Sequence, residues 1–138
     1  MKKTIGIILA VLMLTALCAC GIGEDVDCIY FQNDTGAKIH GLHITSASSD
    51  SWGDPLNYAD ISVGSKIIVD MEKLTEGPGV YDVGAIDENG MNYDVYEVTL
   101  NIDDTIRLSA EDDTAILIVT SADGGSETYY GLAYPQED

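Results

Sequence analysis

The chain has 138 residues, with 24 acidic side chains against six basic ones and a formal net charge of −18 at pH 7. This acidity repels polyanions, so the composition excludes nucleic acid as a partner and favours cations or basic partners, unless it serves only solubility. The length and the 46% of hydrophobic residues indicate one domain with a buried core.

The chain begins with the features of an export signal. Lys2 and Lys3 precede an uncharged run over residues 5–19, and small residues follow. As a helix, this run would extend about 22 Å, which is short of the roughly 30 Å hydrocarbon core of a bilayer. We therefore expect residues 1–19 to be a cleaved signal peptide.

The cleavage region from Leu17 to Gly21 resembles the bacterial lipobox, in which Leu stands three residues before a lipidated cysteine and a small residue stands immediately before it. The resemblance implies that Cys20 carries a diacylglyceryl thioether and palmitate-type acyl chains, which anchor the protein to a membrane. An ordinary signal with a free Cys20 is the alternative. The expected location is the bacterial cell envelope, on the extracytoplasmic side of a membrane.

Cleavage before Cys20 would leave four basic residues against 24 acidic ones, a side-chain charge of −20. Residues 20–27 would then form the lipid anchor and a short tether, and residues 28–138 a single domain. With Cys20 acylated, Cys28 is the one remaining thiol, so we expect no intramolecular disulfide. Because Cys28 begins an apolar run, we expect it to be a buried small side chain rather than a reactive thiol.

Short runs rich in Val, Ile, Tyr and Thr alternate with clusters of Gly, Asn, Asp and Ser along the rest of the chain, which is typical of an all-β fold. The predicted strands span residues 26–32, 37–45, 66–71, 79–86, 92–100, 105–110, 115–120 and 128–134. Short connections without crossover helices predict an antiparallel β-sandwich of seven to eight strands, with a small barrel as the alternative.

Glycines and phase shifts refine this prediction. The segments 33–36 and 87–90 both end in Gly, as a hairpin loop with a final positive φ angle requires. The apolar alternation changes phase at Gly41 and near Tyr96, which indicates β-bulges. Within three later strands, alternation predicts inward-facing sets. These sets are Tyr81, Val83 and Ala85; Ile106 and Leu108; and Ile116 and Ile118.

A long irregular segment over residues 46–63 is the main candidate for a binding loop, because loops of this length are commonly functional. Its candidate binding residues are Asp50, Trp52, Asp54, Asn57 and Asp60. Asp50, Asp54 and Asp60 are candidate Ca²⁺ ligands, since calcium takes carboxylate, amide and carbonyl oxygens. A second oxygen-rich region holds Asp87, Asn89, Asn101, Asp103 and Asp104. The alternative is that these residues form ordinary turns.

Aromatic residues indicate where a protein or glycan ligand could bind. Trp52, the only tryptophan, either contacts a ligand or anchors its loop on the sheet. Tyr129, Tyr130 and Tyr134 either form a binding surface or cover strand edges.

The segments Asn33-Asp34-Thr35-Gly36 and Ser49-Asp50-Ser51-Trp52-Gly53-Asp54, followed by Tyr81-Asp82-Val83 with Asp87 and Gly90, resemble a group of small exported bacterial β-domains of uncharacterised function. That group has an N-x-T-G turn and a serine-rich W-G-D loop. The resemblance implies a β-sandwich and no particular activity. Pro55 departs from the pattern, and the residues from Ala115 onward are interpreted as an addition.

Catalytic motifs receive little support. His40 and His43 are three residues apart in a strand, so they face opposite sides unless the bulge at Gly41 resets the phase, and a shared zinc site is disfavoured. Paired carboxylates for glycoside hydrolysis are too abundant to be specific. The predicted role is a binding or structural module of the envelope with unknown molecular function. A calcium-stabilised β-domain and, with less support, a hydrolase are the alternatives.

Overall fold

The computed structural model describes residues 27–57, 59–74 and 78–136, which form an all-β fold of eight strands with one 3₁₀ turn, η2 (Met71–Lys73). The strands are β1 (Cys28–Asn33), β2 (Ile39–Ser46), β3 (Lys66–Asp70), β4 (Gly79–Asp87), β5 (Met91–Leu100), β6 (Thr105–Glu111), β7 (Thr114–Thr120) and β8 (Ser126–Pro135). All eight overlap the predicted strands. In this part of the chain, no helix has the length and apolar character needed to cross a membrane.

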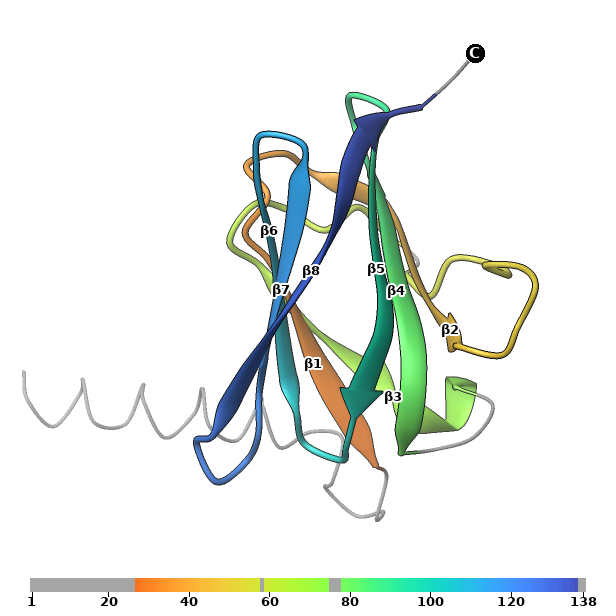
Figure 1. Ribbon diagram of the computed structural model, residues 1–138, viewed down its shortest axis with the longest axis vertical. Coiled ribbons are helices and arrows are strands. Elements are labelled where there is room, and N and C mark those ends of the chain that lie inside the picture. The colour runs from red at the N-terminus through yellow and green to blue at the C-terminus, as the bar shows by residue number, and fades with distance from the viewer. Residues whose placement is uncertain (1–26, 58, 75–77, 137–138) are drawn as a thin grey trace, which may run out of the picture.

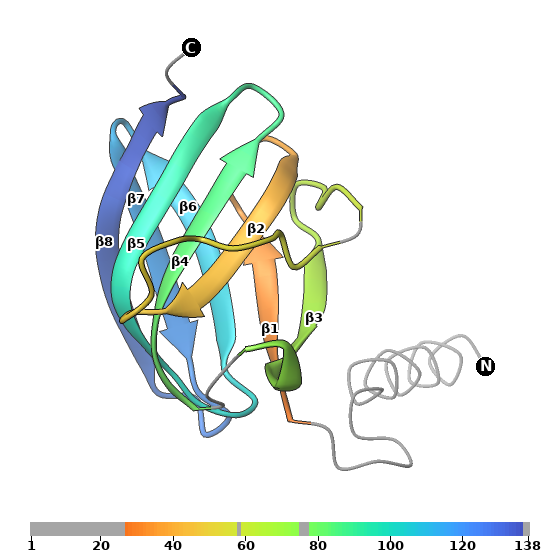
Figure 2. The same cartoon turned by 90° about the vertical axis from the view of Figure 1, so that its right-hand side faces the viewer.

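The strands form one sheet in the order β2-β4-β5-β8-β7-β6-β1-β3, strongly curled into a half-barrel (Figures 1 and 2). The predicted all-β class and number of strands are confirmed. The prediction of an antiparallel β-sandwich is wrong, because the strands form one mixed sheet, and the alternative of a small barrel is met only in part, since the sheet is a half-barrel. β1 pairs with β3 on one side and runs parallel to β6 on the other. Because β1 does not pair with β2, the 33–36 turn is no hairpin, although Gly36 has the expected positive φ of 94°.

The carboxyl-terminal strands are central to this sheet. β8 pairs with β5 on one side and β7 on the other, and β7 continues the sheet to β6. Without them the sheet order would break into two separate groups of three strands. The residues from Thr114 to Pro135 are thus integral to this sheet, and their interpretation as an addition to the family pattern stays a prediction.

The core fills the concave side of the curled sheet. Tyr81, Val83, Ala85, Ile106 and Leu108 are buried there, as alternation predicted. In β7 the predicted phase is wrong, since the buried residues are Ala115, Leu117 and Val119. Residues 115–119 are all apolar, so the sequence contains no alternation, and pairing with β6 decides which side faces in.

Both predicted bulges are present. The β2–β4 register shifts between Ile39 and Gly41. In the second bulge, Tyr81 pairs with Val98 and Val83 with Val95, so β5 has one extra residue. Glu97 takes a φ of 56° there, and its N–H donates to Asp82 Oδ1 at 2.9 Å. Tyr96 and Glu97 lie within this bulge, between the paired residues Val95 and Val98.

Cys28 is fully buried, as expected, and in the uncleaved chain of 138 residues it is disulfide-bonded, so the expectation of a thiol is wrong for this form of the chain. The described residues contain no second cysteine, and Cys18 and Cys20 lie outside them. The predicted signal peptide, lipobox and most of the tether also lie outside the described residues.

Candidate functional site

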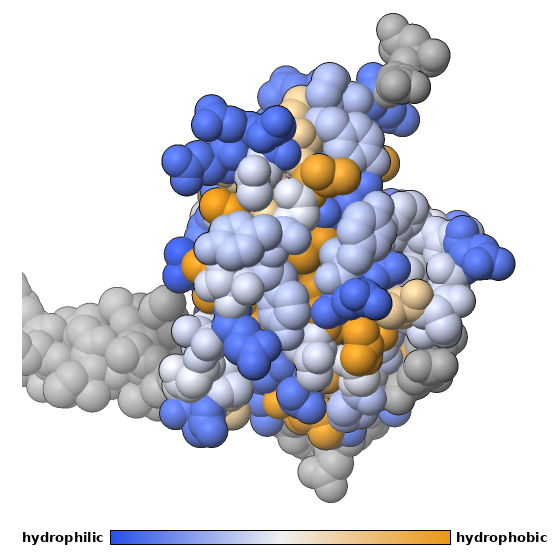
Figure 3. Space-filling model, in the orientation of Figure 1, coloured by the Kyte–Doolittle hydropathy of each residue, from blue (hydrophilic) through white to orange (hydrophobic). Residues whose placement is uncertain are grey.

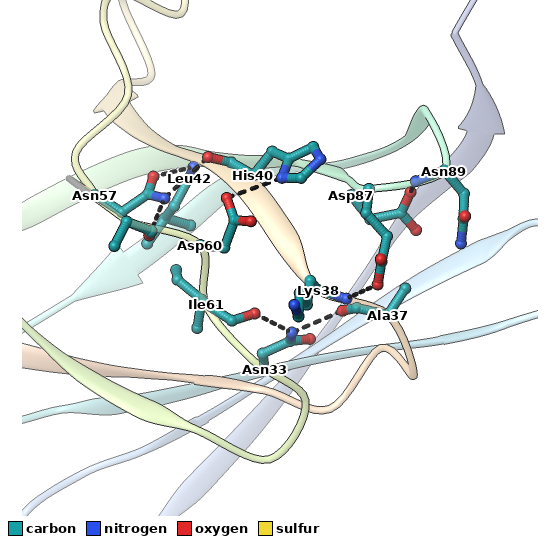
Figure 4. A network of polar contacts seen from close by, with 12 residues as sticks. Asn33, Ala37, Lys38, His40, Leu42, Asn57, Asp60, Ile61, Asp87 and Asn89 are labelled. Atoms are coloured by element: carbon teal, nitrogen blue, oxygen red, sulfur yellow. Dashed lines mark hydrogen bonds and ion pairs between the residues drawn. The ribbon is translucent and has the colours of Figure 1, made fainter.

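The long loop covers the free edge of β2. The Leu56 N–H donates to the Leu42 carbonyl at 2.8 Å, and Ile39 and Ile61 form an isolated bridge further along. Between them, Asn57 Oδ1 accepts from the Leu42 N–H at 2.8 Å (Figure 4). The loop therefore satisfies backbone groups of an edge strand that would otherwise be open to pairing with another chain.

Asn57 and Asp60, two of the predicted binding residues, hold this loop in place. Asn57 Nδ2 donates to the His40 carbonyl at 3.0 Å and to the Ala59 carbonyl at 2.8 Å. Asp60 Oδ1 lies 2.9 Å from His40 Nδ1 (Figure 4). Both side chains are about half exposed. These contacts account for both residues as structural elements of the loop.

The candidate calcium ligands are not brought together. Asp50 and Asp54 are exposed, and Asp60 faces His40. Within residues 27–57, 59–74 and 78–136, no group of three or more His, Cys, Asp and Glu side chains is arranged to hold a metal ion. His40 and His43 also have different neighbours, so they do not form a shared site.

The second oxygen-rich region consists largely of turn-forming residues. Buried Asp87 accepts hydrogen bonds from the N–H groups of Asn89 and Met91 and from the Tyr93 hydroxyl, at 2.8, 3.0 and 2.7 Å. Buried Asp104 accepts from the Asn101 N–H at 2.7 Å. Such bonds satisfy the carboxylates within their own turns, which is the ordinary role of Asp in these positions.

Trp52 lies on the convex face of the sheet, over a strand position without a side chain. Atoms Cη2 and Cζ3 of its ring stand 3.0 Å from where a Cβ at Gly84 would lie. His43, the partner of Gly84 in β2, has its ring centroid 6.4 Å from that of Trp52. On the other side, the Tyr96 centroid is 6.0 Å away with an interplanar angle of 36°. Trp52 thus anchors the loop and joins an aromatic row.

This row continues across β5 to β8 through a buried carboxylate. Asp94 Oδ2 accepts hydrogen bonds from the Tyr134 hydroxyl at 2.5 Å and from the Tyr96 hydroxyl at 3.3 Å, while Asp94 is only 6% exposed. The hydrogen bond to Asp94, followed by burial, raises the pKa of Tyr134 to about 12. The two hydroxyls are therefore donors at neutral pH, and they hold the aromatic rings at a fixed spacing.

Apolar residues of β8 and β7 extend the row. Tyr130 is 71% exposed and Leu132 is 58% exposed, and they project beside the half-buried Ile116 and Ile118. Figure 3 shows orange and pale residues over this face, interspersed with strongly hydrophilic ones. Tyr129 faces the other way and packs against the core. We call the set Trp52, Tyr96, Tyr130, Leu132 and Tyr134 the outer aromatic surface.

A pocket of about 230 Å³ opens at the loop end of this surface. Trp52 and Tyr96 provide its aromatic lining. The remaining lining residues are polar or acidic: Thr45, Ser49, Asp50, Ser51 and Asp82. The sequence identified Asp50 and Trp52, but it did not connect them with Asp82 and Tyr96, because the extra residue in β5 and the course of the loop create that proximity.

A larger pocket of about 420 Å³ lies at one end of the sheet, and its lining includes Asp104, Asp123 and Glu127. Burial raises the pKa of Asp104. Hydrogen bonds lower the pKa of Asp123, and the hydrogen bond from the Ser121 side chain has the largest effect. Asp123 also accepts from the Gly125 N–H at 3.0 Å, and Glu127 accepts from the Tyr129 hydroxyl at 2.8 Å. These carboxylates mainly organise strand ends.

Comparisons with known proteins give no relative. No family model, curated protein or solved structure matches the chain. The resemblance to small exported β-domains stays a prediction. Within that motif the structure gives Asn33 and Thr35 structural roles, because the Asn33 amide bonds the carbonyls of Ala37 and Ile61 and its Oδ1 accepts from Thr35.

Proposed function

We propose that this chain is a bacterial lipoprotein, held on the extracytoplasmic side of an envelope membrane by acyl chains on Cys20, and that its β-domain is a binding module for an envelope ligand. The anchor is supported by the order of basic residues, apolar run and lipobox at the start of the sequence. A purely structural role in the envelope is the competing proposal.

The disulfide of Cys28 gives the anchor a sharp test. Cys18 and Cys20 are the only other cysteines in the chain. Lipobox processing would remove Cys18 and use the sulfur of Cys20 for the thioether, so a lipidated chain has no cysteine left to pair with Cys28. Lipidation and an intrachain disulfide therefore exclude each other in the mature protein.

We would express the full chain in a bacterium and measure the mass of its mature amino-terminal peptide and its partition into detergent. The proposal expects a diacylglyceryl-modified Cys20, partition into the detergent phase, and an alkylatable thiol at Cys28 after unfolding. Cys20→Ser should abolish partition, whereas Cys18→Ser, the matched control, should leave it unchanged. An unmodified Cys20 in a disulfide with Cys28 would refute the anchor.

The binding role is carried by the outer aromatic surface. Four residues on adjoining strands, Tyr96, Tyr130, Leu132 and Tyr134, are each at least 40% exposed, and partly buried Trp52 lies beside Tyr96. Exposed aromatic residues on rigid strands present contact area with little loss of side-chain entropy on binding, and adjoining apolar groups of this kind mark interaction sites. A structural module would not require them to be exposed.

A glycan and peptide array probed with the full chain tests this role. Tyr130→Ser with Leu132→Ser should abolish capture of any ligand that covers β8, while the melting temperature stays within a few degrees, because exposed side chains contribute little to stability. Thr128→Ser is the matched control on the same face. A large loss of stability in the double variant, without any array signal for the parent chain, would favour the structural role.

A hydrolase is a second candidate, because the larger pocket brings Asp104, Asp123 and Glu127 to the lining of one cavity. Hydrolysis of a panel of glycosides by the full chain, lost in both Asp104→Asn and Asp123→Asn, would support it. The calcium-stabilised alternative has no comparable geometric support. Equal melting temperatures in EDTA and in millimolar calcium, at matched ionic strength, would exclude the calcium-stabilised alternative.

A further inference from the structure

The pocket at the loop end of the outer aromatic surface combines two chemical features. Its walls include the rings of Trp52 and Tyr96, whose centroids are 6.0 Å apart. The acidic residues Asp50 and Asp82 also line it, and no lysine or arginine is among its lining residues. Aromatic faces and carboxylates both attract positive charge.

The acidic side of the pocket is fixed in place. Asp82 Oδ1 accepts the N–H of Glu97, the bulge residue, at 2.9 Å, which orients the carboxylate beside the pocket. The pKa of Tyr96 is raised, first by burial, then by the negative charge of Asp94 and the hydrogen bond to it, and then by the negative charge of Asp82. The local potential around the Tyr96 ring is therefore negative, as is the charge of the whole chain.

We propose that this pocket binds the methylated ammonium group of a small organic cation of the choline type, with its methyl groups against Trp52 and Tyr96 and its charge balanced by Asp82 and Asp50. This inference rests on the proposed role as a binding module and names the class of ligand. A quaternary ammonium is weakly hydrated and suits an aromatic wall. A bare metal ion instead needs several oxygen ligands at one point. The described residues contain no group of three or more His, Cys, Asp and Glu side chains that could hold one.

The same group occurs in free choline and in the phosphocholine head group of a lipid. A phosphate beside Asp50 and Asp82 would be repelled, and the net charge of −18 adds to that repulsion. The pocket therefore favours the free cation over phosphocholine.

The single tryptophan makes the test direct, because Trp52 is the only indole in the chain and lines the pocket. The full chain, purified in a non-ionic detergent, is titrated with tetramethylammonium, choline and phosphocholine, with sodium chloride at equal ionic strength as the reference. Fluorescence and calorimetry are read together. We expect saturable binding of tetramethylammonium and choline, and binding of phosphocholine about tenfold weaker.

Variants distinguish binding in the pocket from a general effect of the negative charge of the chain. Asp82→Asn keeps an oxygen for the Glu97 N–H and removes the charge, so it should weaken choline binding about tenfold. Asp112→Asn makes the same charge change in the β6–β7 turn, at a residue whose φ of 57° suits Asn, and should leave affinity unchanged. Tyr96→Phe should retain binding and Tyr96→Ala should lose it.

Three results would overturn the inference. They are heat and fluorescence changes no larger than those with sodium chloride, equal weakening by Asp82→Asn and Asp112→Asn, or tighter binding of phosphocholine than of choline. If these cations do not bind while the array identifies a neutral glycan or peptide, the proposed ligand class is wrong and the proposed role as a binding module is retained. If both experiments are negative, both proposals fail.

Discussion

The ring of Trp52 rests on the backbone of Gly84, with Cη2 and Cζ3 each 3.0 Å from the place where a Cβ would stand. Gly84 has an outward position in β4 between the inward-facing Val83 and Ala85. The absence of a side chain there lets the indole lie flat on the sheet. This pairing connects the loop to the outer aromatic surface and fixes one wall of the smaller pocket.

Gly84→Ala should displace Trp52 without a change in backbone conformation, because the φ of Gly84 is not positive. The added methyl group would stand closer to the indole than nearly all real Cβ contacts. We expect a red-shifted Trp52 emission and stronger quenching by acrylamide. Gly79→Ala is the control, since its Cβ would meet Tyr81 at an ordinary 3.9 Å. An unchanged emission in Gly84→Ala would show that the position of the indole does not depend on the missing side chain at Gly84.

Local signals in the sequence predicted the strands and both bulges, because apolar alternation and turn glycines act over a few residues. They did not predict which strands pair. The parallel pairing of β1 with β6 joins segments about 75 residues apart, and nothing within β1 indicates it. The phase of β7 failed for a related reason, since Ile116 and Leu117 are equally apolar and only the partner strand distinguishes them.

The candidate site divides in the same way. Trp52 and Asp50 stood out because a lone tryptophan in a long polar loop is unusual. Gly84, Asp82 and Tyr96 were not predicted as site residues, because nothing within their own strands indicates a pocket. They form a site only where the loop folds back over β4 and β5 (Figure 2).

Gly131→Ala should be strongly destabilising. A Cβ at residue 131 would lie 2.0 Å from the carbonyl oxygen of Asp94 and 2.9 Å from the Cα of Val95, so β8 and β5 would have to separate. Backbone atoms cannot move aside as a side-chain end can, and we expect a loss of more than about 2 kcal/mol in the free energy of unfolding. Urea unfolding measures it.

Gly125→Ala provides the comparison for this prediction. Its Cβ would meet only side-chain oxygens of Asp123 and Ser121, at 3.4 and 3.5 Å. Its unfolding midpoint should stay close to that of the parent chain. Equal midpoints for Gly131→Ala and Gly125→Ala would show that β8 and β5 do not approach so closely.

Asn57→Ala should loosen the long loop. It removes one acceptor and two donors, which leaves the Leu42 N–H and the His40 carbonyl without the partner that they have now. We expect a loss of about 1–3 kcal/mol and faster proteolysis within residues 46–63. Asn89→Ala is the control, because Asn89 is exposed and its hydrogen bond to Asp87 is donated by its backbone N–H, which the substitution keeps. Equal proteolysis of the two variants would contradict the role of Asn57.

The Asp87–Tyr93 pair should make the fold sensitive to alkaline pH. Burial, followed by the hydrogen bond to Asp87 and the negative charge of Asp87, raises the pKa of Tyr93 from 10.0 to about 12. Between these two values the unfolded chain has lost the phenolic proton and the folded chain keeps it, so the folded state binds more protons. Stability is therefore complete below about pH 10 and falls as the pH rises toward 12, by about 2–3 kcal/mol for a shift of two pKa units.

Tyr93→Phe tests this linkage through two opposite effects. At neutral pH it should destabilise the protein by about 1–3 kcal/mol, because the buried Asp87 Oδ2 loses its 2.7 Å donor. From about pH 10 to pH 12 it should lose less stability than the parent chain, since one ionisation has been removed. Tyr134, which is 40% exposed, also has its pKa raised to about 12, so part of the alkaline loss should persist in the variant. Urea unfolding at several pH values measures both effects, and parallel pH dependences of the two proteins would show that the Tyr93 hydroxyl titrates alike in the folded and unfolded chains.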